Sequence, residues 1–112
     1  MATHDGHRER LRDTFLTHGL DSFHELQALE LLLFYAIPRR DTNPIAHALL
    51  ERFGSLDGVF AASEQELCEV PGIGRHAAAL ILLTPQIVKR SRVAAADTIQ
   101  YIRNGKEAAQ YL

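Results

Sequence analysis

Apolar residues recur every three or four positions through most of this chain, and that spacing places them on one face of an α-helix. The broadest apolar face runs from about Phe23 to Ala36. Shorter segments with the same period predict further helices over residues 7–18, 44–53, 56–60, 64–69 and about 75–92. No segment of the sequence alternates apolar and polar residues between turn signals. The chain is therefore predicted to be all-α, with five or more short helices.

Residues with strong preferences for helix ends mark the boundaries. Gly19 and Gly54 follow predicted helices and can end them, and Pro44 stands near the first position of another. Ser63, with Glu66 three residues later, has the sequence of a capping box. The inward positions between these ends predict a core that contains Leu32, Leu33, Ile45, Leu49, Phe53, Leu67, Ile73, Leu80, Ile81 and Val88.

An approximate internal repeat organises the middle of the chain, where a helix, a hairpin and a second helix occur twice. The first hairpin spans residues 37–41 and the second spans residues 70–74. The second retains two glycines, whereas the first has none and carries the adjacent Arg39 and Arg40. The repeat predicts a doubled helix-hairpin-helix domain over residues 1–92.

The second hairpin predicts a cradle for an anion. Gly72 and Gly74 are free to adopt backbone angles that other residues avoid, and with Ile73 they precede a helix N-terminus. Such a terminus attracts phosphates through unpaired N–H groups and a partial positive charge. Arg75 and His76 open that helix, so all five residues are candidate contacts to a DNA phosphate. A tight turn that only packs two helices is the structural alternative.

The paired arginines of the first hairpin extend this candidate site. Side-chain charge on Arg39 and Arg40 can replace backbone amides toward the same phosphate partner. The alternative is a solvated loop, and it stays open.

Other basic residues have simpler explanations. Along the first predicted helix, arginines at positions 8, 10 and 12 are interspersed with acids, as on a mixed surface. Lys89, Arg90 and Arg92 fall in the expected last turns of a helix, where the helix dipole favours cations.

Overall charge limits the strength of any nucleic-acid binding. The chain has 112 residues, 46% apolar and 23% charged, which suits one domain with one core. Twelve Lys and Arg against fourteen Asp and Glu give a formal net charge of −2, whereas strong charge-driven nucleic-acid binders are basic. DNA binding is therefore expected to be weak, sequence-independent and dependent on local geometry.

No arrangement typical of an enzyme or a metal centre is visible in the sequence. Cys68 is the single cysteine, so it cannot form an internal disulfide, and a packed thiol is expected. His4 and His7 have plausible ligand spacing but no further ligand close by. There is no apolar run of membrane-spanning length and no apolar signal-peptide core. These features predict a non-enzymatic, cytoplasmic module with no metal and no membrane contact.

Two segments carry a resemblance to a known family. Residues 6–12 (Gly-His-Arg-Glu-Arg-Leu-Arg) and 29–42 (Leu-Glu-Leu-Leu-Leu-Phe-Tyr-Ala-Ile-Pro-Arg-Arg-Asp-Thr), with the glycine hairpin, are similar to the N-terminal helix-hairpin-helix domain of the bacterial RadC family of DNA repair proteins. The resemblance covers residues 6–92. It implies a sequence-independent DNA-binding module that tethers a downstream metal-dependent domain to DNA.

Full-length RadC proteins carry a C-terminal JAB/MPN-type domain with a zinc-binding, metalloprotease-like motif. No His-x-His with an Asp at the expected distance occurs here, so residues 93–112 are expected to be a linker toward a JAB/MPN-like domain that this sequence lacks. Residues 93–96 could extend the preceding helix or start this linker. That domain is an expected partner. In the wider helix-hairpin-helix module, hairpin carbonyls also hold a monovalent cation, and the matching positions here are Cys68, Val70 and Ile73.

A second function stays open at this stage. The same hairpins could form a protein-interaction or regulatory module that packs on a partner or on the missing domain. The negative net charge favours this alternative, and the hairpin geometry favours DNA.

Overall fold

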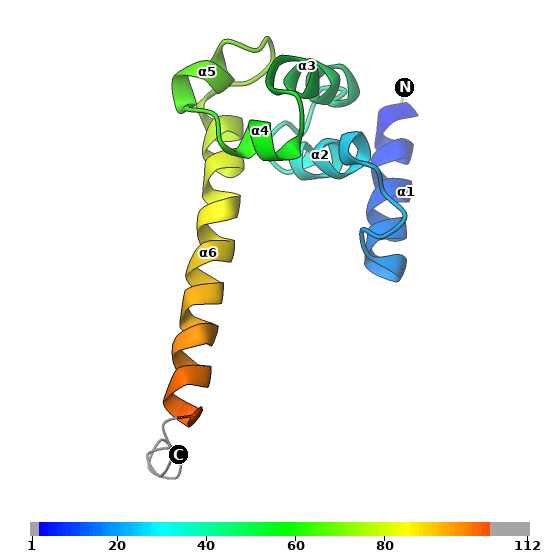
Figure 1. The fold of residues 1–112 in the computed structure, drawn as a ribbon. Coiled ribbons are helices and arrows are strands. Elements are labelled where there is room, and N and C mark those ends of the chain that lie inside the picture. Colours follow the sequence, from blue (N-terminus) through cyan, green and yellow to red (C-terminus); the bar gives the residue numbers. More distant parts are fainter. Residues whose placement is uncertain (1–2, 104–112) are drawn as a thin grey trace. The chain divides into compact units, whose positions relative to one another are not determined.

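A computed structural model describes residues 3–103, which form six α-helices and no strand (Figure 1). These helices are α1 (Thr3–His18), α2 (Glu25–Phe34), α3 (Asn43–Phe53), α4 (Leu56–Phe60), α5 (Glu64–Cys68) and α6 (Arg75–Arg103). The first hairpin joins α2 to α3, the second joins α5 to α6, and α4 lies between the two copies in sequence. The all-α, doubled helix-hairpin-helix prediction is confirmed.

The two ends of the helical region differ from the sequence expectation. α1 begins at Thr3 rather than near residue 7, so it includes the segment that carries His7. α6 continues past residue 92 to Arg103. Its extension contains three consecutive alanines at positions 94–96, and alanine has the highest helix propensity. The segment expected to be a linker is therefore helical up to residue 103, and its remainder lies outside the described residues.

The chain divides after Leu82 into two compact units. The first unit contains α1 to α5 and the beginning of α6, and the described residues of the second form the continuation of α6. Among the residues described, no helix combines the length and apolar character needed to cross a membrane.

Local signals set most helix ends as expected. The Ser63 hydroxyl accepts the Glu66 N–H at 3.1 Å, and the Glu66 carboxylate accepts the Ser63 N–H at 3.0 Å, which confirms the capping box. Gly54 ends α3 with a positive φ of 90°. Pro44 lies in the first turn of α3, where its missing N–H costs nothing.

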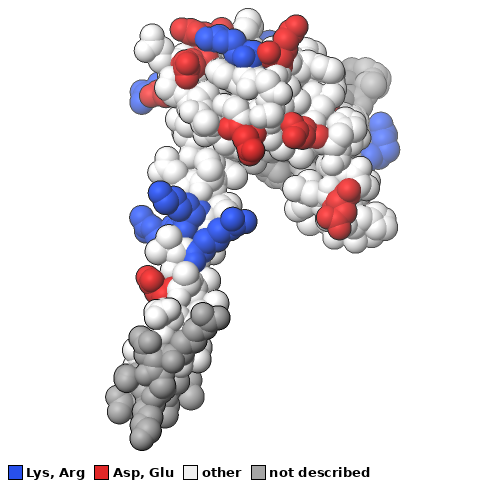
Figure 2. Space-filling view, in the orientation of Figure 1, with Lys and Arg blue, Asp and Glu red and all other residues white. Residues whose placement is uncertain are grey.

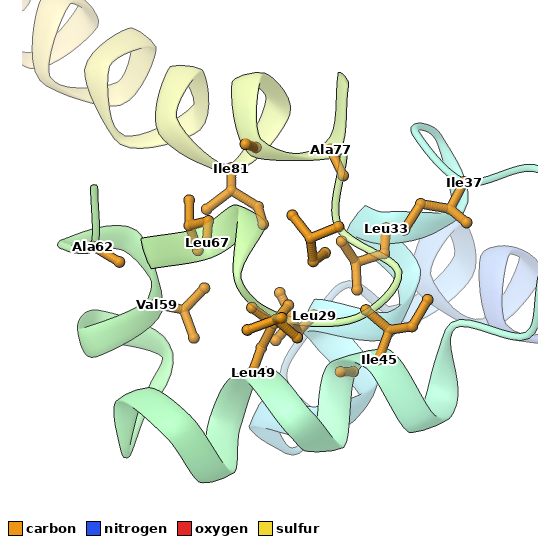
Figure 3. Close-up of a cluster of buried hydrophobic side chains, with 14 residues drawn as sticks. Leu29, Leu33, Ile37, Ile45, Leu49, Val59, Ala62, Leu67, Ala77 and Ile81 are labelled. Atoms are coloured by element: carbon orange, nitrogen blue, oxygen red, sulfur yellow. The ribbon is translucent and has the colours of Figure 1, made fainter. Parts of the chain in front are cut away.

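The main core is built from α2, α3, α4, α5 and the start of α6. Figure 3 shows Leu29, Leu49, Leu67 and Ile81 pointing toward a common centre, and all four are almost fully buried. Most of the predicted core is confirmed as buried, namely Leu33, Ile45, Leu49, Leu67, Ile73 and Ile81. The remaining positions of the first unit are half-buried, namely Leu32, Phe53 and Leu80.

The prediction that Val88 is buried is wrong, because 44% of the residue is exposed. It lies beyond Leu82, where the described residues provide no second element to cover it. A smaller cluster of Leu11, Leu31 and Phe34 packs α1 against α2.

Candidate nucleic-acid interface

The second hairpin is a tight turn fixed to the core. The Val70 carbonyl accepts the Ile73 N–H at 3.0 Å, which closes a four-residue turn with Pro71 second and Gly72 third. Gly72 has a φ of +97°, as the third residue of a type II turn requires. The Ile73 side chain is only 5% exposed and belongs to the main core. The turn and its buried anchor therefore set where α6 begins.

The two glycines of this hairpin differ in their surroundings and in their backbone conformation. A Cβ on Gly72 would lie 2.7 Å from Ile45 Cδ1 and 3.4 Å from an Arg40 guanidinium nitrogen, so the space is filled from within the chain. Gly74 is exposed, does not have a positive φ, and would meet nothing within 4 Å of an added Cβ. Packing explains Gly72, as the structural alternative stated. Neither a close neighbour nor a positive φ requires glycine at position 74.

The N-terminus of α6 has no side-chain cap. Its first intrahelical bond runs from the Ala78 N–H to the Gly74 carbonyl at 3.0 Å. The N–H groups of Arg75, His76 and Ala77 precede it and have no acceptor inside the helix, and Gly74 offers no side chain to cap them. These amides and the positive end of the helix dipole are available to an anion. The Ile73 amide is used in the turn instead.

The two hairpins meet in one open pocket of about 320 Å³. The residues that line it include six of the seven predicted site residues, and Ile73 alone lies elsewhere, in the core. The lining residues are Ala36, Ile37, Pro38, Arg39, Arg40, Gly72, Gly74, Arg75, His76 and Ala77. None of them is acidic. Residues far apart in sequence thus share one surface that carries three arginines.

The charge of this surface is partly balanced from outside the pocket. Arg75 Nε lies 3.2 Å from a Glu64 carboxylate oxygen, but 89% of the Arg75 side chain is exposed, so the pair is weak and easily exchanged for a ligand. Glu69, the acid directly before the second hairpin in sequence, pairs with Arg52 at 2.6 Å. The pocket therefore keeps a positive balance within a chain whose net charge is negative.

Arg8 is the residue that sequence reasoning missed. It was expected on a mixed surface, but it is only 8% exposed. Its guanidinium donates to the carbonyls of Phe34 at 3.2 Å, Ile37 at 2.6 Å and Arg40, and it stacks on the Phe34 ring with 4.6 Å to the centroid. Arg8 thus holds the first hairpin by its backbone. Its position three residues before Leu11, on the inward stripe of α1, is the signal that could have identified it.

A second buried polar group supports the same junction. The Glu30 carboxylate is almost fully buried and accepts a hydrogen bond from His7 Nε2 at 2.9 Å and a long one from Asn43 at 3.5 Å. The Thr42 hydroxyl donates to the Glu30 carbonyl at 3.2 Å. α1, α2 and the start of α3 are therefore joined by hydrogen bonds next to the first hairpin. His7, considered above as a metal ligand, contacts a carboxylate instead.

Two further expectations concern residues 68–73. Cys68 is exposed rather than packed, because the inward position of the short α5 is taken by Leu67. Of the carbonyls matched to a monovalent cation, that of Val70 accepts the Ile73 N–H and retains one lone pair. The cation site stays a prediction.

Comparison with known proteins supports this description of the second hairpin. Residues 55–84 match the helix-hairpin-helix motif. The match spans α4, α5, the glycine hairpin and the start of α6, and the first hairpin lies outside it.

The chain is also similar to the UPF0758 protein FN0909 of Fusobacterium nucleatum, with 48% identity over 82 residues. That alignment covers 73% of this chain and 35% of the relative, so the chain spans about a third of that protein's length. No solved structure gives a significant match.

Proposed function

We propose that this chain is a sequence-independent DNA-binding module of a RadC-like DNA repair protein. The backbone amides at the start of α6 contact a phosphate, and Arg39, Arg40 and Arg75 supply positive charge around it. The module is non-enzymatic and cytoplasmic, its binding is weak, and residues 1–92 tether a C-terminal JAB/MPN-like domain to DNA.

The observation that carries this proposal is the empty space at Gly74. A glycine costs backbone entropy relative to other residues, and here neither a positive φ nor a close neighbour offsets that cost. The exposed glycine faces a pocket with three arginines and uncapped helix amides. Close approach of a phosphate group explains the glycine, because any Cβ at this position would occupy the same space.

Substitutions at Gly74 can separate DNA contact from folding. Asp and Asn are better N-caps than glycine, so Gly74→Asp and Gly74→Asn should leave the free energy of unfolding unchanged or raise it by a few tenths of a kcal/mol. Both fill the space, and only Asp adds a negative charge to the anion site. We expect DNA affinity to fall in the order parent, Gly74→Asn, Gly74→Asp, equally for every DNA sequence.

The affinity is measured by fluorescence anisotropy with linear and branched duplexes at several salt concentrations. Arg75→Ala should lower the slope of log affinity against log salt by about 0.9, the value for one lost phosphate contact. Circular dichroism and urea unfolding check that each variant is folded. Parent protein that does not bind DNA at low salt, or a Gly74→Asp variant that binds like the parent, would refute the proposal.

A protein-interaction module is the second candidate, and one observation favours it. Four large apolar side chains are exposed, namely Phe15 and Leu16 at the end of α1, Leu20 just after α1, and Tyr35 just after α2. Such exposed groups suit contact with a protein partner or with the C-terminal domain. This candidate would replace the first if the parent protein fails to bind DNA.

A further inference from the structure

A second group of basic residues lies on α6, away from the hairpins in sequence. Lys89, Arg90 and Arg92 are all exposed, and Figure 2 shows basic side chains gathered on the middle of this helix. From Arg75 to Ala96 the helix contains no acidic residue. Residues 75–96 are therefore strongly basic, although the net charge of the whole chain is negative.

Helix electrostatics do not account for these three cations. The sequence placed them in the last turns of a helix, but α6 continues to Arg103, and the dipole acts only within the last turn. Positions three and four residues from each of them hold no acid, and Lys89 and Arg92 are themselves three apart. Among the described residues they form no ion pair. Their mutual repulsion opposes the helix they lie on.

The side chains offer donors suited to phosphate oxygens. Gln86, Lys89, Arg90 and Val93 border an open hollow of about 400 Å³ within the second unit. Lysine and arginine present only donors, and the Gln86 amide adds another. A partner that supplies several anionic oxygens would satisfy all of them and remove the repulsion.

The arrangement favours DNA over an anionic membrane. At 100° per residue the three cations spread over about 160° of the helix circumference, and Val93 falls between Lys89 and Arg90. A helix that lies on a membrane needs its basic and apolar faces separated. Here the two kinds of residue are interleaved.

We propose that residues 86–93 of α6 form a second phosphate-contacting surface for DNA, separate from the hairpin pocket. This inference rests on the proposed function. Lys89, Arg90 and Arg92 each contact a phosphate, so the surface adds as many as three contacts to those of the hairpins.

The test compares Lys89→Gln/Arg90→Gln/Arg92→Gln with a charge-conserving variant, Lys89→Arg/Arg90→Lys/Arg92→Lys. The first should lower the salt slope of DNA binding by about 2 to 3 and weaken affinity at 100 mM salt at least roughly tenfold. The second should bind like the parent. Arg10→Gln/Arg12→Gln removes positive charge on α1, outside both proposed surfaces, and should leave the slope unchanged. All three are checked for helix content by circular dichroism.

Failure of this inference can be told apart from failure of the proposed function. Parent binding that depends on Gly74, with an unchanged salt slope in the triple glutamine variant, would overturn the inference and leave the proposed function standing. Parent protein that does not bind DNA at all would overturn both. Loss of binding to phosphatidylserine vesicles, with DNA binding unchanged, would assign the segment to a membrane and overturn the inference.

Discussion

The two hairpins of this chain solve the same structural problem in different ways. The second hairpin is held by residues within itself, through the turn hydrogen bond between Val70 and Ile73 and the positive φ of Gly72. The first hairpin has no such glycine, and its carbonyls are gathered by Arg8, from another helix 26 to 32 residues earlier. Local geometry makes one hairpin, and a long-range buried arginine makes the other.

The same contrast applies to the hydroxyl group that precedes a helix in each copy. Ser63 caps its own helix through the Glu66 N–H. Thr42 precedes α3 but makes no side-chain cap there, and its hydroxyl reaches back to the Glu30 carbonyl. A repeat recognised in sequence can therefore keep its order of helix, hairpin and helix while the interactions that stabilise it change from local to distant.

The largest expected effect is in the local hairpin. Gly72→Ala places a methyl group 2.7 Å from Ile45 Cδ1 at a positive φ, which should cost about 3 kcal/mol of unfolding free energy from left-handed backbone and overpacking together. Urea denaturation measures it. The matched control is Gly74→Ala, where the added methyl meets nothing and the change should stay within about 1 kcal/mol. Equal effects at the two glycines would contradict the assignment of separate roles.

The next effect concerns the distant support of the first hairpin. Arg8→Met keeps an apolar stem but leaves three carbonyls without their donor, which should destabilise the fold by about 2 kcal/mol. The exposed Arg10 on the same helix provides the control, and Arg10→Met should change stability by no more than about 0.5 kcal/mol. If Arg8→Met is as mild as Arg10→Met, the first hairpin does not depend on α1.

A smaller effect tests the local cap before the second hairpin. Ser63→Ala removes the acceptor for the Glu66 N–H and should cost about 1 kcal/mol, typical of a lost N-cap. Ser63→Asp restores an acceptor and should recover most of the loss. A urea midpoint that is unchanged in Ser63→Ala would show that α5 is held by Leu67 packing alone.

The smallest effect depends on pH and belongs to the same cap. The Ser63 backbone N–H, and then its hydroxyl, hold the pKa of Glu66 below its ordinary value of 4.5. A carboxyl whose pKa is lower in the folded state stabilises the fold above pH 4.5, and this contribution is lost as pH falls through the lowered pKa. The stability advantage of the parent over Glu66→Gln should therefore be present at pH 7 and shrink toward pH 3. An advantage that is constant over this range would contradict the shift.

The sequence predicted the parts of the fold whose causes lie within a few residues. Gly54, the Ser63 capping box and the Val70 to Gly74 turn all act locally, and the structure has them as expected. Arg8 could not be assigned, because its carbonyl partners are brought to it only by the packing of α1 on α2.

In the candidate site, too, the sequence could not predict what depends on contacts between distant residues. The sequence left Arg39 and Arg40 open between a solvated loop and a ligand contact, and only the fold shows that they line the same pocket as Gly74 and Arg75. The roles of Gly72 and Gly74 could not be separated either, since the neighbour that fills the space at Gly72 is Ile45 of another helix. The continuation of α6 was left open between a longer helix and a linker, because no stop residue at position 92 marked an end.

An amide-resolved NMR titration of the protein with a short DNA duplex at low salt shows most directly whether both hairpins contact DNA in the one pocket that they share. We expect the largest amide shifts at Gly74, Arg75 and His76, accompanied by shifts at Arg39 and Arg40. Shifts confined to α1 around Phe15 and Leu16, or no shifts at all, would contradict this expectation.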